Sequence, residues 1–308
     1  RRYPLKPRGR ISRLRAFFDV IAFRVDRAPA RAAAAGRVTA RAGCPEIGDS
    51  LPAKEGSPTQ PPGGRVNLAW LPLALTAALA TAVVDVLSKN YFSDLRAFEM
   101  GLIRLAYASP CLVAGLFLIP RPELDTTFWL CIAVGLPLEV TALLCYMRAI
   151  KVSPLSLTVP FLAFTPAFVI LTGYLFLGEV LTWRGILGIA LVVAGSYVLN
   201  LSRAREQWLA PITAVFREQG SWLMLLTGFI FSFTATIGKV AILHSSPPFF
   251  GVTYFLCLLV LMLLIAPAVP GVRAGNLFLR PLPAAMVGLA TAVVVFSHTL
   301  AISLVEAA

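Results

Sequence analysis

The long apolar stretches that follow residue 67 constrain this chain more than any other feature of its sequence. They run for about 18 to 25 residues and are separated by short polar or proline-containing breaks. Since a helix rises about 1.5 Å per residue, each stretch can cross a hydrocarbon core about 30 Å thick. Backbone groups find no water in lipid, so helices must fill these stretches. We predict eight spans, at residues 68–88, 98–119, 127–148, 153–177, 183–201, 221–242, 249–269 and 282–303.

The overall composition supports the same fold class. Hydrophobic residues make up 58% of the 308 residues and charged residues 14%, whereas about 25% of the residues of a soluble domain are charged. A soluble core of this size does not need so much apolar sequence. We therefore predict an all-α membrane protein, built as a polytopic helical bundle.

The first 65 residues differ from the rest. They hold 14 of the 27 Lys and Arg residues but only 5 of the 15 acidic ones. We interpret residues 1–65 as a basic, disordered N-terminal tail, with an organelle-targeting segment as the alternative. Because the excess positive charge belongs to the tail, it does not indicate a nucleic-acid partner.

Metal, cofactor and catalytic motifs are missing from the sequence. The five cysteines form no CxxC pair, and two histidines are too few for a histidine-based metal site. The sequence has no GxSxG, HExxH or P-loop motif. We therefore predict no metal, no cofactor, no catalytic residues and no direct use of ATP, which favours a protein that is not an enzyme.

A weak internal repeat organises the membrane region. Residues 86–94, VLSKNYFSD, resemble residues 236–244, TIGKVAILH, and residues 133–150 resemble residues 286–302. Two copies of five helices must run inverted to each other, because an odd number of spans changes the side of entry. We predict a first five-helix repeat, a connecting loop and an incomplete second repeat, at residues 66–201, 202–220 and 221–308, with about eight spans present.

Helices four and five carry a resemblance to a known family. The elements that carry it are Ala149, Ser153-Pro154, Pro166, the turn Leu177-Gly178-Glu179 with Leu181-Thr182, and Gly185, Gly188 and Gly195. This pattern resembles the EamA-type family of the drug/metabolite transporter superfamily. The resemblance implies ten helices in two inverted five-helix halves around a central cavity. It also implies transport of metabolites, amino acids or toxic compounds.

From this resemblance we expect a multi-pass transporter, a secondary carrier or exporter, in a bacterial inner (plasma) membrane. Its expected partners are the lipid bilayer, a small-molecule solute, protons and a second copy of the chain. A non-transporting scaffold or accessory subunit is the alternative function. An integral membrane enzyme acting on lipid-linked substrates is the third, and it predicts polar residues gathered at one membrane face.

Ionisable residues within spans are costly and usually face a protein interior or water. Glu139 follows Pro137 near the middle of its span and is our first candidate for a protonatable coupling or substrate-binding carboxylate. Asp85 and Lys89 stand four apart, so a local ion pair is one interpretation. For Lys89 and Lys239, the simpler interpretation is that the side chains reach to the lipid headgroups. For His298, the simpler interpretation is packing with a hydrogen bond. The candidate substrate or coupling residues are Glu139, Asp85, Lys89, Lys239, Arg104 and His298.

Prolines and glycines mark the helices that carry the resemblance. Three prolines in one span, Pro154, Pro160 and Pro166, predict a bent or broken helix whose freed carbonyls line a cavity, with curvature for packing as the alternative. Gly188 and Gly195 are seven apart and share a face, with Gly185 beside it. We predict that these glycines let helices pack closely.

Overall fold

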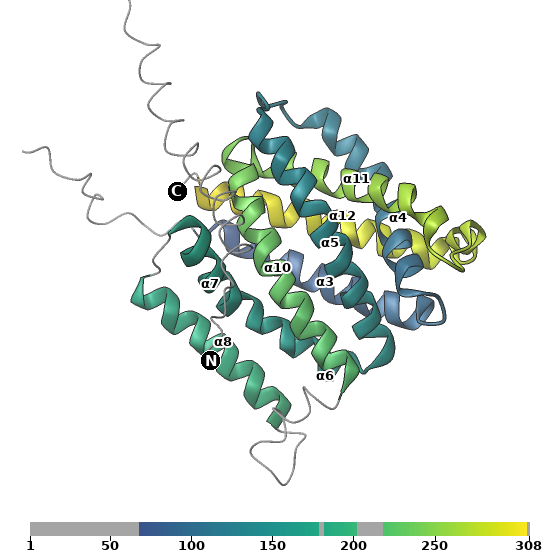
Figure 1. Cartoon of the computed structure of the whole chain (residues 1–308), viewed down its shortest axis with the longest axis horizontal. Helices are drawn as coiled ribbons and strands as arrows, with labels where there is room; N and C mark the ends of the chain where they lie inside the picture. Colours follow the sequence, from purple (N-terminus) through teal and green to yellow (C-terminus); the bar gives the residue numbers. More distant parts are fainter. Residues whose placement is uncertain (1–67, 179–181, 202–217, 307–308) are drawn as a thin grey trace, which may run out of the picture. The chain divides into compact units, whose positions relative to one another are not determined.

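The computed structural model describes residues 68–178, 182–201 and 218–306, and the helices that these residues form are shown in Figure 1. The predictions for the tail 1–65, for most of the loop 202–220 and for Glu179 lie outside the described residues. The helices are α3 (Trp70–Phe92), α4 (Ala97–Leu118), α5 (Thr126–Val152), α6 (Leu155–Thr158), the 3-10 helix η1 (Val159–Phe164), α7 (Thr165–Leu177), α8 (Trp183–Leu201), α10 (Gln219–Leu243), α11 (Pro247–Ile265), the 3-10 helices η2 (Ala266–Ala268) and η3 (Ala274–Phe278), and α12 (Pro281–Glu306).

The described residues fold into helices without strands, and the chain is a polytopic α-helical membrane protein. The described residues contain seven helical spans that are long and apolar enough to cross a membrane, counting α6, η1 and α7 as one. The remaining predicted span, the fifth in the chain, corresponds to α8, whose apolar part at Trp183–Ser196 is shorter. The described helices begin and end within a few residues of the eight predicted spans, and seven of these spans are confirmed as long and apolar enough to cross a membrane.

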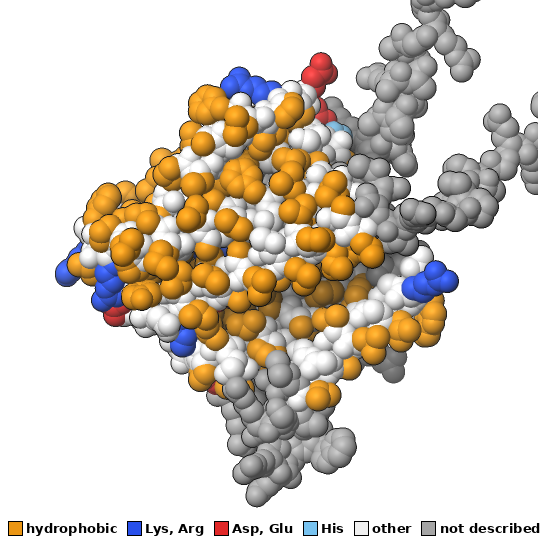
Figure 2. Space-filling view, turned by 180° about the vertical axis from the view of Figure 1, so that it is seen from behind, with side chains coloured by type: hydrophobic (Ala, Val, Ile, Leu, Met, Phe, Trp, Pro, Cys, Tyr) orange, Lys and Arg blue, Asp and Glu red, His pale blue; other side chains and the backbone are white. Residues whose placement is uncertain are grey.

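The outer surface matches this assignment. On the face drawn in Figure 2, hydrophobic side chains spread over the whole described surface, whereas the charged side chains lie near its edges. One exposed apolar stripe follows α3 through Leu71, Leu75, Leu79 and Val83, and the spacing of four puts these side chains on one helix face. Such a surface is suited to contact with lipid rather than with water.

Two pairs of helices form the most extensive contacts of the bundle. Helix α5 packs along α10, and α3 packs along α12; Figure 1 shows α5 and α10 side by side. Helix α4 lies between them and contacts both α11 and α12. Thus the first helix of the membrane region packs on the last described helix, and the third packs on the sixth.

Glycines allow some of these helices to approach closely. A Cβ atom on Gly288 of α12 would collide with the backbone of Tyr107 on α4, and one on Gly115 of α4 would collide with the Phe296 ring of α12. Close packing of small residues is a main source of helix association in lipid. Gly115 and Gly288 therefore set the distance between α4 and α12.

The glycines that we predicted to pack helices are not at such contacts. A Cβ atom on Gly188 or Gly195 would meet nothing within 4 Å among the described residues, and both glycines are exposed on α8, whereas Gly185 is half-buried. Helix α8 contacts η1 and α7 through another face, which includes the buried Ser196. The face shared by Gly188 and Gly195 therefore makes no close helix contact among the described residues, and the packing role of these glycines stays a prediction.

The fourth span is broken, as its three prolines predict. Pro154 precedes α6, Pro160 lies in the first turn of η1, and Pro166 lies in the first turn of α7. A proline at the start of a helical segment removes an amide that has no helical partner anyway. The three prolines thus divide the span into segments and interrupt none of them internally.

A pair of substitutions tests the role of Gly288. We expect Gly288→Ala to destabilise the protein by about 1–3 kcal/mol, as overpacking does, and to lower its melting temperature in detergent. Gly188→Ala is the matched control, since it gains the same helix propensity without a collision and should be neutral or slightly stabilising. Equal melting temperatures for the two variants would contradict the close approach of α4 and α12.

Candidate functional site

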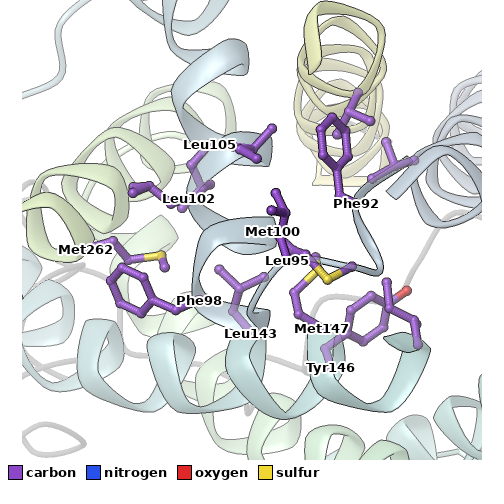
Figure 3. Close-up of a cluster of buried hydrophobic side chains, with 14 of the residues drawn as sticks. Phe92, Leu95, Phe98, Met100, Leu102, Leu105, Leu143, Tyr146, Met147 and Met262 are labelled. Atoms are coloured by element: carbon purple, nitrogen blue, oxygen red, sulfur yellow. The ribbon is translucent and has the colours of Figure 1, made fainter. Parts of the chain in front are cut away.

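A buried apolar layer surrounds the polar residues of the bundle. It is formed mainly by side chains of α4, α5 and α11, with Leu105, Met147 and Met262 at most 1% exposed. Figure 3 shows the side chains of Leu143 and Met147 on α5 pointing toward Met100 of α4. Figure 3 also shows the Tyr146 ring beside Met147, at the edge of this layer. Polar atoms in such surroundings need partners within the protein.

Tyr146 bonds to the first of the buried acids. Asp85 of α3 and Tyr146 of α5 are each 4% exposed. The Tyr146 hydroxyl donates a hydrogen bond to Asp85 Oδ2 at 2.5 Å, across 61 residues of sequence. A hydrogen bond to a charged acceptor is among the stronger ones in proteins. This contact ties α3 to α5 inside the bundle.

Arg104 of α4 links this pair to the second acid. Its guanidinium interacts electrostatically with Asp85 and with Tyr146, and also with Glu139 of α5. Arg104 therefore lies near both carboxylates and places one positive charge between them, without forming an ion pair within 4 Å among the described residues. A charge within a membrane span is costly, so such groups usually face a protein interior or water.

Glu139 is half-buried near the middle of α5 and also faces two other helices. It interacts with Thr234 of α10 and with Tyr254 of α11. A Cβ atom on Gly135, one turn earlier on the same face of α5, would lie 3.1 Å from the Tyr254 hydroxyl oxygen. Gly135 thus leaves room for the Tyr254 ring beside Glu139. We call Asp85, Arg104, Glu139, Tyr146 and Tyr254 the central polar cluster.

Several buried polar atoms in and next to this cluster make no hydrogen bond within the described part of the chain. They are Asp85 Oδ1, Ser88 Oγ, Arg104 Nε, Thr253 Oγ1 and Tyr254 Oη. Buried polar atoms are nearly always bonded, and leaving one without a partner costs about 1–3 kcal/mol. These five atoms belong to α3, α4 and α11, and each could accept or donate a further hydrogen bond.

Lys89 has a different role from the ones that we considered from the sequence. Its ammonium donates hydrogen bonds at 2.6 Å to the carbonyl oxygens of Ile150 and Ser153, at the C-terminal end of α5. Cations stabilise helix C-termini, where carbonyl groups lack helical partners. Lys89 therefore fastens α3 to the end of α5, while Asp85 bonds to Tyr146.

The remaining ionisable candidates lie away from the central polar cluster. Lys239 is exposed near the end of α10, and His298 is exposed on α12. Of the six candidates, the structure thus brings together three: Asp85, Arg104 and Glu139. The described residues include no group of three or more His, Cys, Asp or Glu residues that could hold a metal ion.

Of the three prolines, Pro166 lines a pocket beside the break in the fourth span. The pocket has a volume of about 500 Å³ and lies between η1, α7, α8 and α10, where Leu162, Val169, Ile189 and Phe231 form much of its wall. Thr165 also lines it and has a buried hydroxyl without a hydrogen-bond partner among the described residues. The hydroxyl of Ser196 on α8 donates a hydrogen bond to the carbonyl oxygen of Pro160.

Sequence reasoning missed the two tyrosines of the cluster. Tyr146 stands seven residues after Glu139, which places both on one face of α5, and this spacing could have pointed to it. Tyr254 offers no comparable signal, because its position beside Glu139 depends on how α11 packs against α5.

The arrangement defines a class of protein: a multi-pass membrane protein whose apolar helices enclose a charged cluster. The comparison with known families agrees with this class. Residues 68–201 match the model of the EamA-like transporter family, which confirms the resemblance drawn from the sequence. No curated protein and no solved structure matches the chain.

We expect Tyr146→Phe to destabilise the protein by about 1.5–3 kcal/mol, the range for a hydrogen bond to a charged group, because Asp85 loses its donor. Thermal unfolding in detergent measures the change. Tyr174→Phe is the matched control, since Tyr174 of α7 is 60% exposed and should tolerate the same loss of a hydroxyl. An unchanged melting temperature for Tyr146→Phe would show that Arg104 alone satisfies Asp85.

Proposed function

We propose that this protein is a secondary carrier or exporter that moves a small metabolite, amino acid or drug-like solute by alternating access. The observation that carries the proposal is the central polar cluster. Charged side chains within membrane spans are expensive and are kept where they serve a solute or ion path. The match to the EamA-like transporter family supports the same function.

The helix contacts support two inverted repeats. Suppose that α3, α4 and α5 correspond to α10, α11 and α12. The contact between α3 and α12 then corresponds to the contact between α10 and α5, and the contact between α4 and α11 corresponds to itself. This is the pattern that an approximate two-fold axis between the halves produces. The central polar cluster draws residues from α3, α4, α5 and α11, so it would lie where the two halves meet. A site between the repeats is the place where alternating access acts on a solute.

The charge balance of the cluster favours a solute that carries a positive group. Asp85 and Glu139 are two carboxylates, and Arg104 can neutralise one of them. The other requires a proton or a cationic group when it is buried in a medium of low dielectric constant. We propose that a proton and the amino group of the solute compete for Glu139, which would couple transport to a proton gradient.

The alternatives explain the cluster less well. A scaffold has no need for two carboxylates and a guanidinium inside its spans, since apolar residues there would pack at lower cost. An enzyme acting on lipid-linked substrates would gather polar groups at one membrane face, whereas Glu139 lies near mid-span. We place the protein in a bacterial inner membrane, and this location rests on the family resemblance alone.

Flux into proteoliposomes tests the proposal with a panel of radiolabelled amino acids and the organic cation tetraphenylphosphonium. Because protons compete for Glu139, we expect the KM for a transported cation to rise as the pH falls from about 8 to about 6. Glu139→Gln should make KM independent of pH. Glu123→Gln, at an exposed acid outside the spans, is the control and should behave like the wild type.

Two outcomes would contradict the proposal separately. An unchanged pH dependence in Glu139→Gln would remove Glu139 as the coupling group but leave the carrier function standing. Absence of flux for every tested solute, in vesicles where the protein is folded, would count against a carrier of these solute classes.

A further inference from the structure

The pocket beside the break in the fourth span lies at the middle depth of the membrane region. Of the residues that line it, Thr165 is near the centre of the fourth span and Phe231 is at the centre of α10. Ile189, on the opposite wall, is in the middle of the apolar part of α8. Three spans thus place the cavity at a depth that the lipid headgroups do not reach. We call it the mid-span pocket.

The mid-span pocket is open to the outside of the described bundle. Every residue that lines it is half-buried, which indicates a recess rather than a sealed cavity. One wall is formed by α8, which lies at the edge of the described helices (Figure 1) and contacts η1 and α7. A molecule dissolved in the bilayer can therefore reach the pocket sideways, without crossing the headgroup region again.

The walls of the pocket exclude a charged ligand. Seven of its eight lining residues are apolar, and none of these described residues is ionisable. A charged group would find no counter-ion here, which is costly in a medium of low dielectric constant. The volume of about 500 Å³ is typical of small-molecule sites, which are mostly lined by apolar and aromatic side chains. An uncharged and largely apolar molecule matches these walls.

Thr165 gives the pocket its single polar side chain. Other threonines of the spans, such as Thr81, Thr141 and Thr227, donate a hydrogen bond to the carbonyl oxygen four residues earlier, at 2.8, 2.9 and 2.8 Å. The Thr165 hydroxyl is buried and has no hydrogen-bond partner among the described residues. It lies against α10 at Gly228, where a Cβ atom would be 2.7 Å from the hydroxyl oxygen.

The unpartnered hydroxyl favours a ligand that carries an acceptor. Threonine in a helix populates two χ1 rotamers, so the Thr165 hydroxyl can turn from the α10 wall into the pocket. A buried hydroxyl without a partner is unfavourable, and a ligand that accepts its hydrogen bond removes this cost. A hydrocarbon of the same shape does not.

We propose that the mid-span pocket binds an uncharged, mostly apolar small molecule that has one hydrogen-bond acceptor and enters from the bilayer. Leu162, Ile189 and Phe231 surround its apolar body. The Thr165 hydroxyl donates to its acceptor. This ligand differs from the cationic solute proposed for the central polar cluster, since the pocket and the cluster share no residue. The acyl chain of a lipid also matches the apolar walls, but it brings no acceptor to this depth.

Photolabelling with benzophenone tests the proposal, because this probe is uncharged and apolar, has one carbonyl acceptor and bonds to nearby C–H groups under ultraviolet light. The full chain in lipid nanodiscs is irradiated at increasing probe concentrations, and labelled peptides are quantified by mass spectrometry. We expect labelling of residues 162–170, 186–192 and 228–234 to saturate. Labelling of the exposed face of α3, at residues 71–83, should rise in proportion to the probe.

Thr165→Val tests the hydrogen bond with little change of shape. The benzophenone concentration at half-saturation should rise about two- to tenfold, which is the range for one hydrogen bond. Diphenylmethane, the analogue without the carbonyl, should compete with benzophenone equally well in both proteins. Thr141→Val is the matched control, since Thr141 is exposed on α5 and donates to Pro137 within its own helix.

Ala163→Trp tests the pocket itself, because the larger side chain fills it, and should abolish the saturable labelling. Ala78→Trp adds the same side chain to the exposed face of α3 and should leave the labelling unchanged. Melting temperatures in the same nanodiscs show which variants are folded, and Thr165→Val decides alone if Ala163→Trp is not.

Two results would overturn the proposal. One is labelling of the pocket that does not saturate, as expected where lipid acyl chains fill it. The other is an equal half-saturation concentration in the wild type and in Thr165→Val. None of these measurements involves flux, so this inference and the proposed function can fail separately.

Discussion

Every backbone and side-chain polar group that enters the hydrocarbon core must find its partner inside the protein, and the rest of this structure depends on that constraint. The fourth span shows how it is met where the helix breaks. At the break, the Ser196 hydroxyl of α8 donates a hydrogen bond to the carbonyl oxygen of Pro160. The pocket beside Pro166 lies against the same two helices, η1 and α8. A neighbouring helix thus supplies a hydrogen-bond donor to the interrupted span.

Charge obeys the same constraint more strictly. Asp85 has Tyr146 and Arg104 within reach, and Glu139 has Thr234, Tyr254 and the same Arg104. One guanidinium that serves two carboxylates leaves the cluster short of one positive charge. In the proposed carrier, a proton or a cationic solute supplies that charge, so the state of the cluster would depend on what is bound. A carrier needs this dependence at its central site.

The sequence predicted the spans well, because the length and apolarity of a span follow from the membrane itself. Asp85, Arg104 and Glu139 were also found, since a charge within an apolar run stands out. The sequence did not reveal which face of each helix points inward. Apolar residues surround these helices on all sides, so the periodicity that orients a soluble helix is weak. For that reason Tyr254 and the role of Lys89 were missed, and Gly188 and Gly195 meet no neighbour among the described residues.

Helix α5 connects the cluster to both ends of the bundle. Its N-cap, Asp125, meets His244, its middle carries Glu139 and Tyr146, and its last carbonyls are held by Lys89. Lys89 and Asp85 both belong to α3, and both hold the C-terminal half of α5. Extensive packing on α10 holds the same helix from another side. The position of Glu139 is therefore set by contacts that α5 makes with helices from both parts of the chain.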